Sequence, residues 1–200
     1  MTILRFAAPS PYVRKVRIAA ALLGLADQIE LQPTDTSKPD DAFWRDNPLG
    51  KIPVLKAEDG AEYYDSRVIV EYLDQRAGGG KIIPRDGAAR FSALRMQALG
   101  DGINDASLLQ VYEGRYRPAE KIVQGWLDLQ AGKVARGLAA LEAAPPPPLT
   151  ATPDVGQIAV ACALGYLDLR FAGAWRKTIR VRSAGSINSP ARSRRSAKPG

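Results

Sequence analysis

Three dipeptides in the first third of the chain could hold a small ligand. Ser10–Pro11 and Asp65–Ser66 each predict the start of a helix, because a capping side chain precedes a residue suited to the first turn. The first N–H groups of a helix have no partner within it and therefore bind anions. Between them lies Ile52–Pro53, near the beginning of an apolar run. Proline cannot donate to a strand ladder, so Pro53 must lie at the beginning or edge of a strand.

Several kinds of active site are excluded by residues that the chain lacks. It has no histidine, which excludes a histidine-based triad, a histidine general base and a histidine-ligated metal. It has one cysteine, Cys162, which excludes an internal disulfide, a CxxC redox pair and a zinc site of several thiolates. Cys162 lies in an apolar segment and is expected to be a buried small hydrophobic residue. We therefore expect no metal site.

Length and composition indicate a globular protein. The chain has 200 residues, of which 46% are hydrophobic and 24% charged, which allows one large domain or two small ones. No run of 18 apolar residues occurs, so no membrane-spanning segment is predicted. The first residues lack the pattern of a signal peptide. We expect a cytoplasmic protein that does not bind membranes.

The net charge of +7 comes from one end of the chain. Residues 171–200 carry eight basic side chains and no acidic one, whereas the other 170 residues carry 20 basic and 21 acidic groups. The body of the protein is therefore nearly neutral, and we do not expect it to bind nucleic acid.

Short strands and helices alternate through residue 76. Helices are predicted from Pro11 to a stop at Gly24, and from Ser66 to the glycines at 78–80. In the first helix, the charged side chains at 14, 15 and 17 are expected to point away from the apolar face. The strands are predicted over 2–7, 27–32, 52–57 and 61–64, with a loop or short helix over 34–46. This order predicts a small α/β domain over 1–76.

The second half is predicted to be all-helical. A linker over 77–87 precedes two long helices, over 88–111 and 118–144. The apolar stripe of the second of these helices includes Ile122, Trp126 and Leu129. Asp154 and Gln157 form a capping box for a further helix, which is apolar almost all round and therefore expected to be central. We place this helical domain at 88–175.

The three dipeptides stand within longer motifs that resemble the glutathione transferase superfamily. These are Ser-Pro-Tyr at 10–12, Gly-Lys-Ile-Pro-Val-Leu at 50–55 and Asp-Ser at 65–66, together with the capped helix carrying IAVACALGYLDLRF. The similarity covers about residues 1–175 and is greatest to bacterial members whose first helix opens with serine or cysteine. It implies a thioredoxin-like N-terminal domain, a helical-bundle C-terminal domain and a homodimer. Glutathione is the implied co-substrate, with no metal.

The resemblance implies a catalytic role for Ser10. The thiol of glutathione, with a pKa of about 8.5, is mostly protonated at pH 7, so an enzyme must favour the thiolate. A hydrogen bond from the Ser10 hydroxyl and the positive end of its helix would do so. Ser10 could instead be only a helix cap, and Tyr12, Arg14 or backbone donors are the alternatives for activating the thiol.

The other two motifs are implied to hold the ends of glutathione. A cis Ile52–Pro53 bond would turn the backbone of Ile52 toward the peptide backbone of the ligand. Ser66 would bind the γ-glutamyl carboxylate, and Asp65 the ammonium group beside it. Lys51 and Lys38 are candidates for the glycine carboxylate, although either could be simply solvated.

These roles predict a glutathione transferase that conjugates the glutathione thiolate to a small electrophile, as detoxification enzymes do. The alternative is a non-catalytic glutathione-binding or protein-interaction module on the same fold. In the family, the segment 101–105 faces the cleft between the domains, so it is a candidate for second-substrate contacts, as are Tyr112 and Tyr116.

The end of the chain departs from the family pattern. Residues 176–200 lose the apolar periodicity of a last helix and are rich in serine and arginine, which predicts a basic segment of low order. A reading-frame shift near Trp175 would explain the abrupt change, and resequencing the source DNA tests it.

Overall fold

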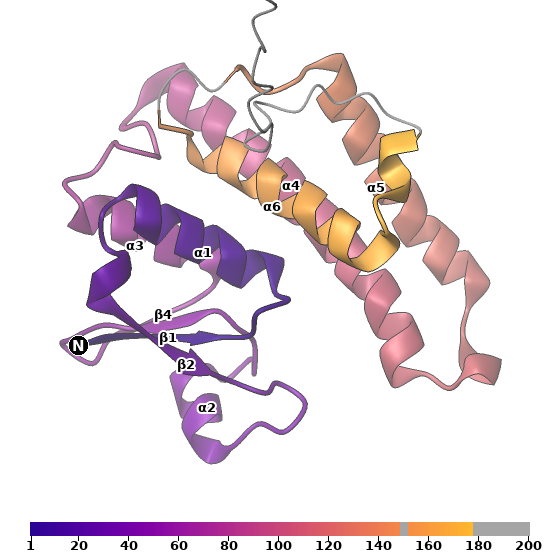
Figure 1. Cartoon of the computed structure of the whole chain (residues 1–200), viewed down its shortest axis with the longest axis horizontal. Helices are drawn as coiled ribbons and strands as arrows, with labels where there is room; N and C mark the ends of the chain where they lie inside the picture. The colour runs from indigo at the N-terminus through magenta and orange to yellow at the C-terminus, as the bar shows by residue number, and fades with distance from the viewer. Residues whose placement is uncertain (149–151, 178–200) are drawn as a thin grey trace, which may run out of the picture.

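The computed structural model describes residues 1–148 and 152–177 (Figure 1). The N-terminal half contains a four-stranded sheet in the order β2-β1-β3-β4. β1 pairs in parallel with β2 and antiparallel with β3, and β3 pairs antiparallel with β4. The strands are β1 (Thr2–Phe6), β2 (Ile29–Pro33), β3 (Val54–Lys56) and β4 (Glu62–Tyr63). The predicted α/β domain is confirmed, and each strand is shorter than, or shifted from, its predicted range.

Helices lie on both sides of this sheet (Figure 1). α1 (Pro11–Leu22) and α3 (Ser66–Arg76) cover one face, and α2 (Asp41–Asp46) lies against the other. The alternation along β1 explains the two layers, because Leu4 is buried in the apolar core with α1 and α3 whereas Arg5 binds Asp46 of α2.

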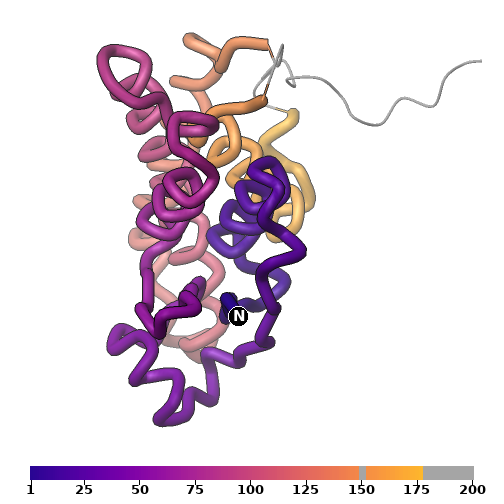
Figure 2. Tube along the Cα trace, turned by 90° about the vertical axis from the view of Figure 1, so that its left-hand side faces the viewer, coloured from indigo at the N-terminus to yellow at the C-terminus, as the bar shows by residue number. Residues whose placement is uncertain are grey.

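The C-terminal half consists of three long helices, as predicted. They are α4 (Gly87–Tyr116), α5 (Gln124–Ala143) and α6 (Val155–Phe171). Short 3-10 turns occur in this half at Ala119–Lys121 and Ala174–Lys177, and in the N-terminal half at Ala26–Gln28. The Asp154–Gln157 capping box is present, with bonds of 2.9 and 3.0 Å. α6 is central, because it packs against α4 on one side and against α1 on the other. α1 in turn lies between α3 and α6 (Figure 2).

Two glycines let α4 and α6 approach closely. A Cβ atom on Gly100 would lie 2.7 Å from the backbone of Ala159, and one on Gly156 would lie 2.6 Å from Met96. The apolar core at this contact continues into the N-terminal domain, where Cys162 and Ile158 of α6 pack with residues of α1 and α3. The two domains therefore share one core along α6.

The structure corrects two predictions, one about the direction of a side chain in α1 and one about the start and apolar stripe of α5. Lys15 does not point to solvent but is buried, with an exposed fraction of 1%, because α4 supplies a carboxylate for it. The helix predicted from residue 118 begins at Gln124, after a 3-10 turn and an extended link. The start of its apolar stripe is exposed because the lower ends of α4 and α5 extend beyond α6 (Figure 1); the residues concerned are Ile122, Trp126 and Leu129.

Within the described ranges, no helix has both the length and the apolar character needed to cross a membrane. The predicted basic segment over 176–200 lies outside the described residues from position 178 onward.

Candidate functional site

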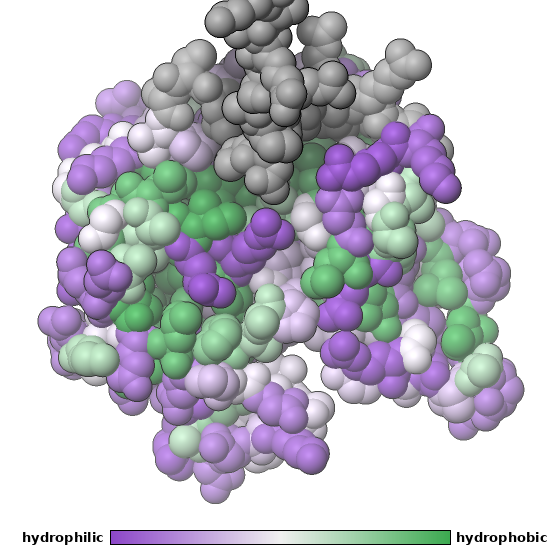
Figure 3. All heavy atoms as spheres, in the orientation of Figure 1, coloured by the Kyte–Doolittle hydropathy of each residue, from purple (hydrophilic) through white to green (hydrophobic). Residues whose placement is uncertain are grey.

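A cavity of about 970 Å³ lies between the two domains. Figure 3 shows the surface indented between the N-terminal domain and the lower ends of α4 and α5. This cavity is lined by Pro53 and by five residues to which the resemblance assigns a role, namely Ser10, Lys51, Ile52, Asp65 and Ser66. Segments up to 56 residues apart in the sequence thus meet at one site.

Ser10 caps α1 at the wall of the cavity. Its Oγ accepts a hydrogen bond from the backbone N–H of Val13 at 3.3 Å, and Pro11 occupies the first turn. Capping uses the oxygen only as an acceptor, so the hydroxyl hydrogen can still be donated to a ligand. Helix capping and a role toward a ligand are therefore compatible at this residue.

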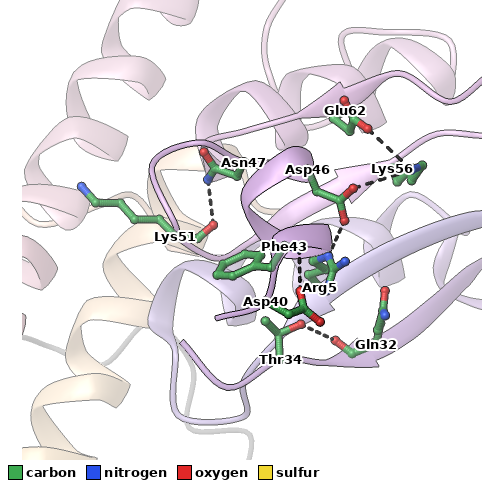
Figure 4. A network of polar contacts seen from close by, with 10 residues as sticks. All are labelled: Arg5, Gln32, Thr34, Asp40, Phe43, Asp46, Asn47, Lys51, Lys56 and Glu62. Atoms are coloured by element: carbon green, nitrogen blue, oxygen red, sulfur yellow. Dashed lines mark hydrogen bonds and ion pairs between the residues drawn. The ribbon is translucent and has the colours of Figure 1, made fainter. Parts of the chain in front are cut away.

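The loop that precedes β3 is held in place by Asn47. This buried side chain donates to the carbonyl of Lys51 at 2.8 Å (Figure 4). It also accepts from the N–H of Leu49 at 3.0 Å. The Ile52–Pro53 peptide bond that follows is cis, as the resemblance implies. Lys51, Ile52 and Pro53 of this loop line the cavity.

The start of α3 forms the third part of the site. Asp65 caps the helix by accepting from the N–H of Arg67 at 2.9 Å, and Ser66 is buried, with an exposed fraction of 2%. Asp65, Ser66 and Arg67 line the same cavity as Ser10, so the start of α3 lies at its wall. A helix start of this kind stabilises a carboxylate.

The two lysines proposed for the glycine carboxylate lie in different places. Lys51 lines the cavity, on the side of Ile52. Lys38 lines a separate, smaller depression beside Arg5 and Asp40. The structure thus brings Lys51 to the other predicted residues but does not bring Lys38 there.

Sequence reasoning missed a buried ion cluster beside the cavity. Nζ of Lys15 lies 2.8 Å from both carboxylate oxygens of Asp101, and Nε of Arg67 lies 3.0 Å from the same carboxylate. Lys15 belongs to α1, Arg67 to α3 and Asp101 to α4, so this cluster joins the domains. The only sequence signal is a lysine among apolar positions of α1, and it does not name the partner.

The alternatives to Ser10 occupy different positions. The Tyr12 hydroxyl lines the cavity but donates to Asp105, and burial together with that carboxylate raises its pKa far above the ordinary value. Tyr12 is therefore a neutral phenol whose proton is already engaged. The Arg14 guanidinium lies against Gly165 of α6, and Arg14 is not among the residues lining the cavity.

The helical side of the cavity carries aromatic and basic side chains. Tyr112 and Tyr116 were predicted to face the cleft, and both line the cavity. Their rings contact each other edge to face, with their centres 5.1 Å apart. Arg115, Tyr166 and Arg170 also line it, and nothing in the sequence singled them out. Both Asp101 and Asp105 of the segment 101–105 reach the cavity wall.

Cys162 takes no part in this site. It is buried between the domains, and burial raises the pKa of its thiol to about 11. A thiol in such surroundings is protonated at neutral pH and unreactive, which agrees with its predicted structural role.

Comparisons with known proteins agree with this geometry. The models for the N-terminal and C-terminal domains of glutathione S-transferase match residues 4–81 and 124–185, respectively. An uncharacterized GST-like protein of Escherichia coli (strain K12), YibF, is 36% identical over 164 residues, which cover 80% of this chain and 79% of that protein.

Two solved structures are similar over most of their length. A glutathione transferase family member from Pseudomonas fluorescens Pf-5, with bound glutathione, has 46% identity and a TM-score of 0.83, with 88% of each chain covered. A glutathione S-transferase from Methylobacillus flagellatus KT, also with glutathione bound, has 37% identity and a TM-score of 0.81, with 90% of this chain and 89% of that one covered. Since both domain models match in the order of the fold, and relatives share over a third of their residues across most of the chain, this protein belongs to the glutathione transferase family.

Proposed function

We propose that this protein binds glutathione in the interdomain cavity and transfers its thiolate to a small electrophile. The observation that carries the proposal is the meeting of two helix starts and the Ile52 backbone at one cavity wall. Relatives of 46% and 37% identity hold glutathione in their solved structures, which supports the same ligand here. As in the resemblance that the sequence shows, we propose a cytoplasmic homodimer with a role in detoxification.

The proposed placement of glutathione follows from the charges at the wall. Its γ-glutamyl carboxylate binds the first N–H groups of α3 and the Ser66 hydroxyl, and its ammonium group pairs with Asp65. Its peptide backbone pairs with that of Ile52, and its glycine carboxylate reaches Lys51. This arrangement directs the sulfur toward Ser10 at the start of α1.

Ser10 would then act on the sulfur. A hydrogen bond from its hydroxyl, together with the helix start, stabilises the thiolate relative to the thiol and so lowers the pKa of glutathione. The sulfur electron pair then attacks the electrophilic carbon while the cavity holds both reactants close together.

Replacing the Ser10 hydroxyl tests this role. A hydrogen bond to a charged group contributes about 1.5–3 kcal/mol, so Ser10→Ala should lower kcat/KM for conjugation about 10- to 100-fold, with the Kd of glutathione nearly unchanged. Ser10→Gly should show the same loss while costing helix α1 only a few tenths of a kcal/mol as a cap. Conjugation of an aryl halide, followed by absorbance, measures the rate. The exposed Ser92 provides the control, Ser92→Ala.

Binding and catalysis are separated by a second measurement. Glutathione at 100 times its Kd should stabilise the protein by about 2.7 kcal/mol in thermal unfolding. Stabilisation without turnover of any electrophile would leave the non-catalytic binding module as the function. Full conjugation activity in both Ser10 variants would instead assign thiol activation to backbone donors.

A further inference from the structure

Two arginines lie near the ends of the helices that form the C-terminal side of the cavity. Arg115 lies in the last turn of α4 and Arg170 in the last turn of α6, and both line the cavity. Each guanidinium lies over a tyrosine ring that also lines it: Arg115 is 5.8 Å from the centre of Tyr112, and Arg170 is 5.7 Å from that of Tyr166.

These four side chains form one cluster. Burial raises the pKa of both Tyr112 and Tyr166, and the positive charges of both arginines oppose that rise at each ring. Both cations therefore act on both phenols, although they come from different helices. The cluster presents flat rings and two planar cations to the same space.

The positive charge of this cluster has no acidic counterpart in the described part of the chain. Neither arginine forms a salt bridge there, and Nε of Arg170 is buried without a hydrogen-bond acceptor. The two acidic residues on the α4 side of the cavity are already engaged, because Asp101 binds Lys15 and Arg67 while Asp105 accepts from Tyr12.

The usual reasons for arginine at these positions account for only part of this arrangement. A cation near the end of a helix interacts favourably with the helix dipole, and a guanidinium gains from lying over a ring. Neither effect supplies an acceptor for the buried Nε of Arg170. A buried donor without a partner is unfavourable, and a ligand with acceptor oxygens would supply that partner.

We propose that Arg115 and Arg170 are specificity-determining residues that bind the carboxylate of an aromatic electrophile. The proposal rests on the function proposed above and names the class of its second substrate. The half-buried Tyr112 ring packs against the aromatic body, and the guanidinium groups pair with the carboxylate through charge-assisted hydrogen bonds. A neutral carboxamide of the same shape offers one uncharged acceptor oxygen and therefore pairs with the guanidinium groups less strongly.

The reaction itself leaves the carboxylate untouched. For a benzylic halide, the glutathione sulfur forms a bond to the benzylic carbon, the carbon–halogen bond breaks, and the halide leaves with the bonding electron pair. The same carboxylate is thus present in substrate and product, so the product measures recognition without turnover.

The experiment compares two product analogues of nearly equal shape. These are S-(4-carboxybenzyl)glutathione and its neutral carboxamide, and calorimetry gives the Kd of each for the full chain. The wild type should bind the carboxylate at least tenfold more tightly, since one charge-assisted hydrogen bond contributes about that factor. Arg115→Gln and Arg170→Gln should each reduce the ratio, and the double variant should bring it to about one. Arg95→Gln removes the same charge from an exposed position of α4 outside the cavity and should keep the wild-type ratio.

The Kd of unmodified glutathione in every variant shows that the cavity is intact. A wild-type ratio near one, or a preference that persists in the double variant, overturns the proposal even though glutathione binds. A ratio that falls equally in Arg95→Gln also overturns it, because the effect then comes from net charge alone. If glutathione itself does not bind the wild type, the function proposed above fails and this inference fails with it.

Discussion

The two walls of the cavity are built in different ways. The N-terminal wall consists of two helix starts and a strand-leading loop, so backbone N–H and carbonyl groups and capping side chains provide its polar character. The helical wall consists of side chains from α4 and α6, in which three tyrosines and two arginines lie beside aspartate, leucine and valine residues. The first wall suits a ligand with a peptide backbone that does not vary, because backbone groups of the protein can pair with it. The second wall suits a substrate that only protein side chains recognise.

This difference shows where variation is tolerated. Helix starts and capping residues serve the fold as well as the proposed ligand, so replacing a cap by alanine costs stability even where the Kd of glutathione is unchanged. Within the described residues, Arg115 and Arg170 form no salt bridge, so we expect their replacement to leave the fold intact. Two questions follow: whether the ion cluster holds the two walls together, and whether each wall binds its own part of the substrates.

The largest effect is expected at the ion cluster that joins the two walls. Asp101→Asn leaves the charge of Lys15 buried without a counter-ion, which should destabilise the protein by about 3–5 kcal/mol in urea unfolding. The exposed Asp128 on α5 provides the matched control, and Asp128→Asn should change stability by less than about 0.5 kcal/mol.

A double variant shows whether the loss comes from the uncompensated charge. Lys15→Met combined with Asp101→Leu removes both charges and should recover most of the stability. Equal losses in Asp101→Asn and Asp128→Asn would show that the two domains do not depend on this cluster.

An intermediate effect is expected from the two lysines of the N-terminal half. Lys51→Met should raise the Kd of glutathione about two- to fivefold, because an exposed ion pair contributes up to about 1 kcal/mol. Lys38→Met should leave this Kd unchanged, since Lys38 lines a different depression. Calorimetric titration with glutathione measures both. Equal increases in the two variants would mean that general charge, and not the position of Lys51, attracts the ligand.

The smallest effect is expected at Tyr12, which lies between the two walls. Tyr12→Phe removes a hydroxyl whose proton is already donated to Asp105, so the conjugation rate should fall less than about twofold. The pH profile of kcat/KM should also keep its wild-type shape. A loss as large as that of Ser10→Ala would move thiol activation from Ser10 to Tyr12.

Much of the first wall could be predicted because its signals are local. Helix capping, the proline at a strand start and the capping box of α6 each depend on residues within four positions of one another. The second wall gave no such signal, because a tyrosine or arginine near a helix end has many possible neighbours. The predicted helix start at residue 118 and the outward direction of Lys15 were wrong for the same reason, since each depends on which helix lies alongside.

The sequence by itself determined the alternation of strands and helices, the two capped helix starts at Ser10 and Asp65, and the absence of histidine or paired-cysteine chemistry. Only the tertiary structure decided that Lys15 finds Asp101, that Lys38 lies away from the cavity, and that Arg115 and Arg170 line it with no salt bridge to any described residue. The physical reason is range. Capping and periodicity are fixed by neighbours along the chain, whereas the partner of a charged side chain is fixed by which helices pack together. Lys15 and Asp101, for example, are 86 residues apart in the sequence.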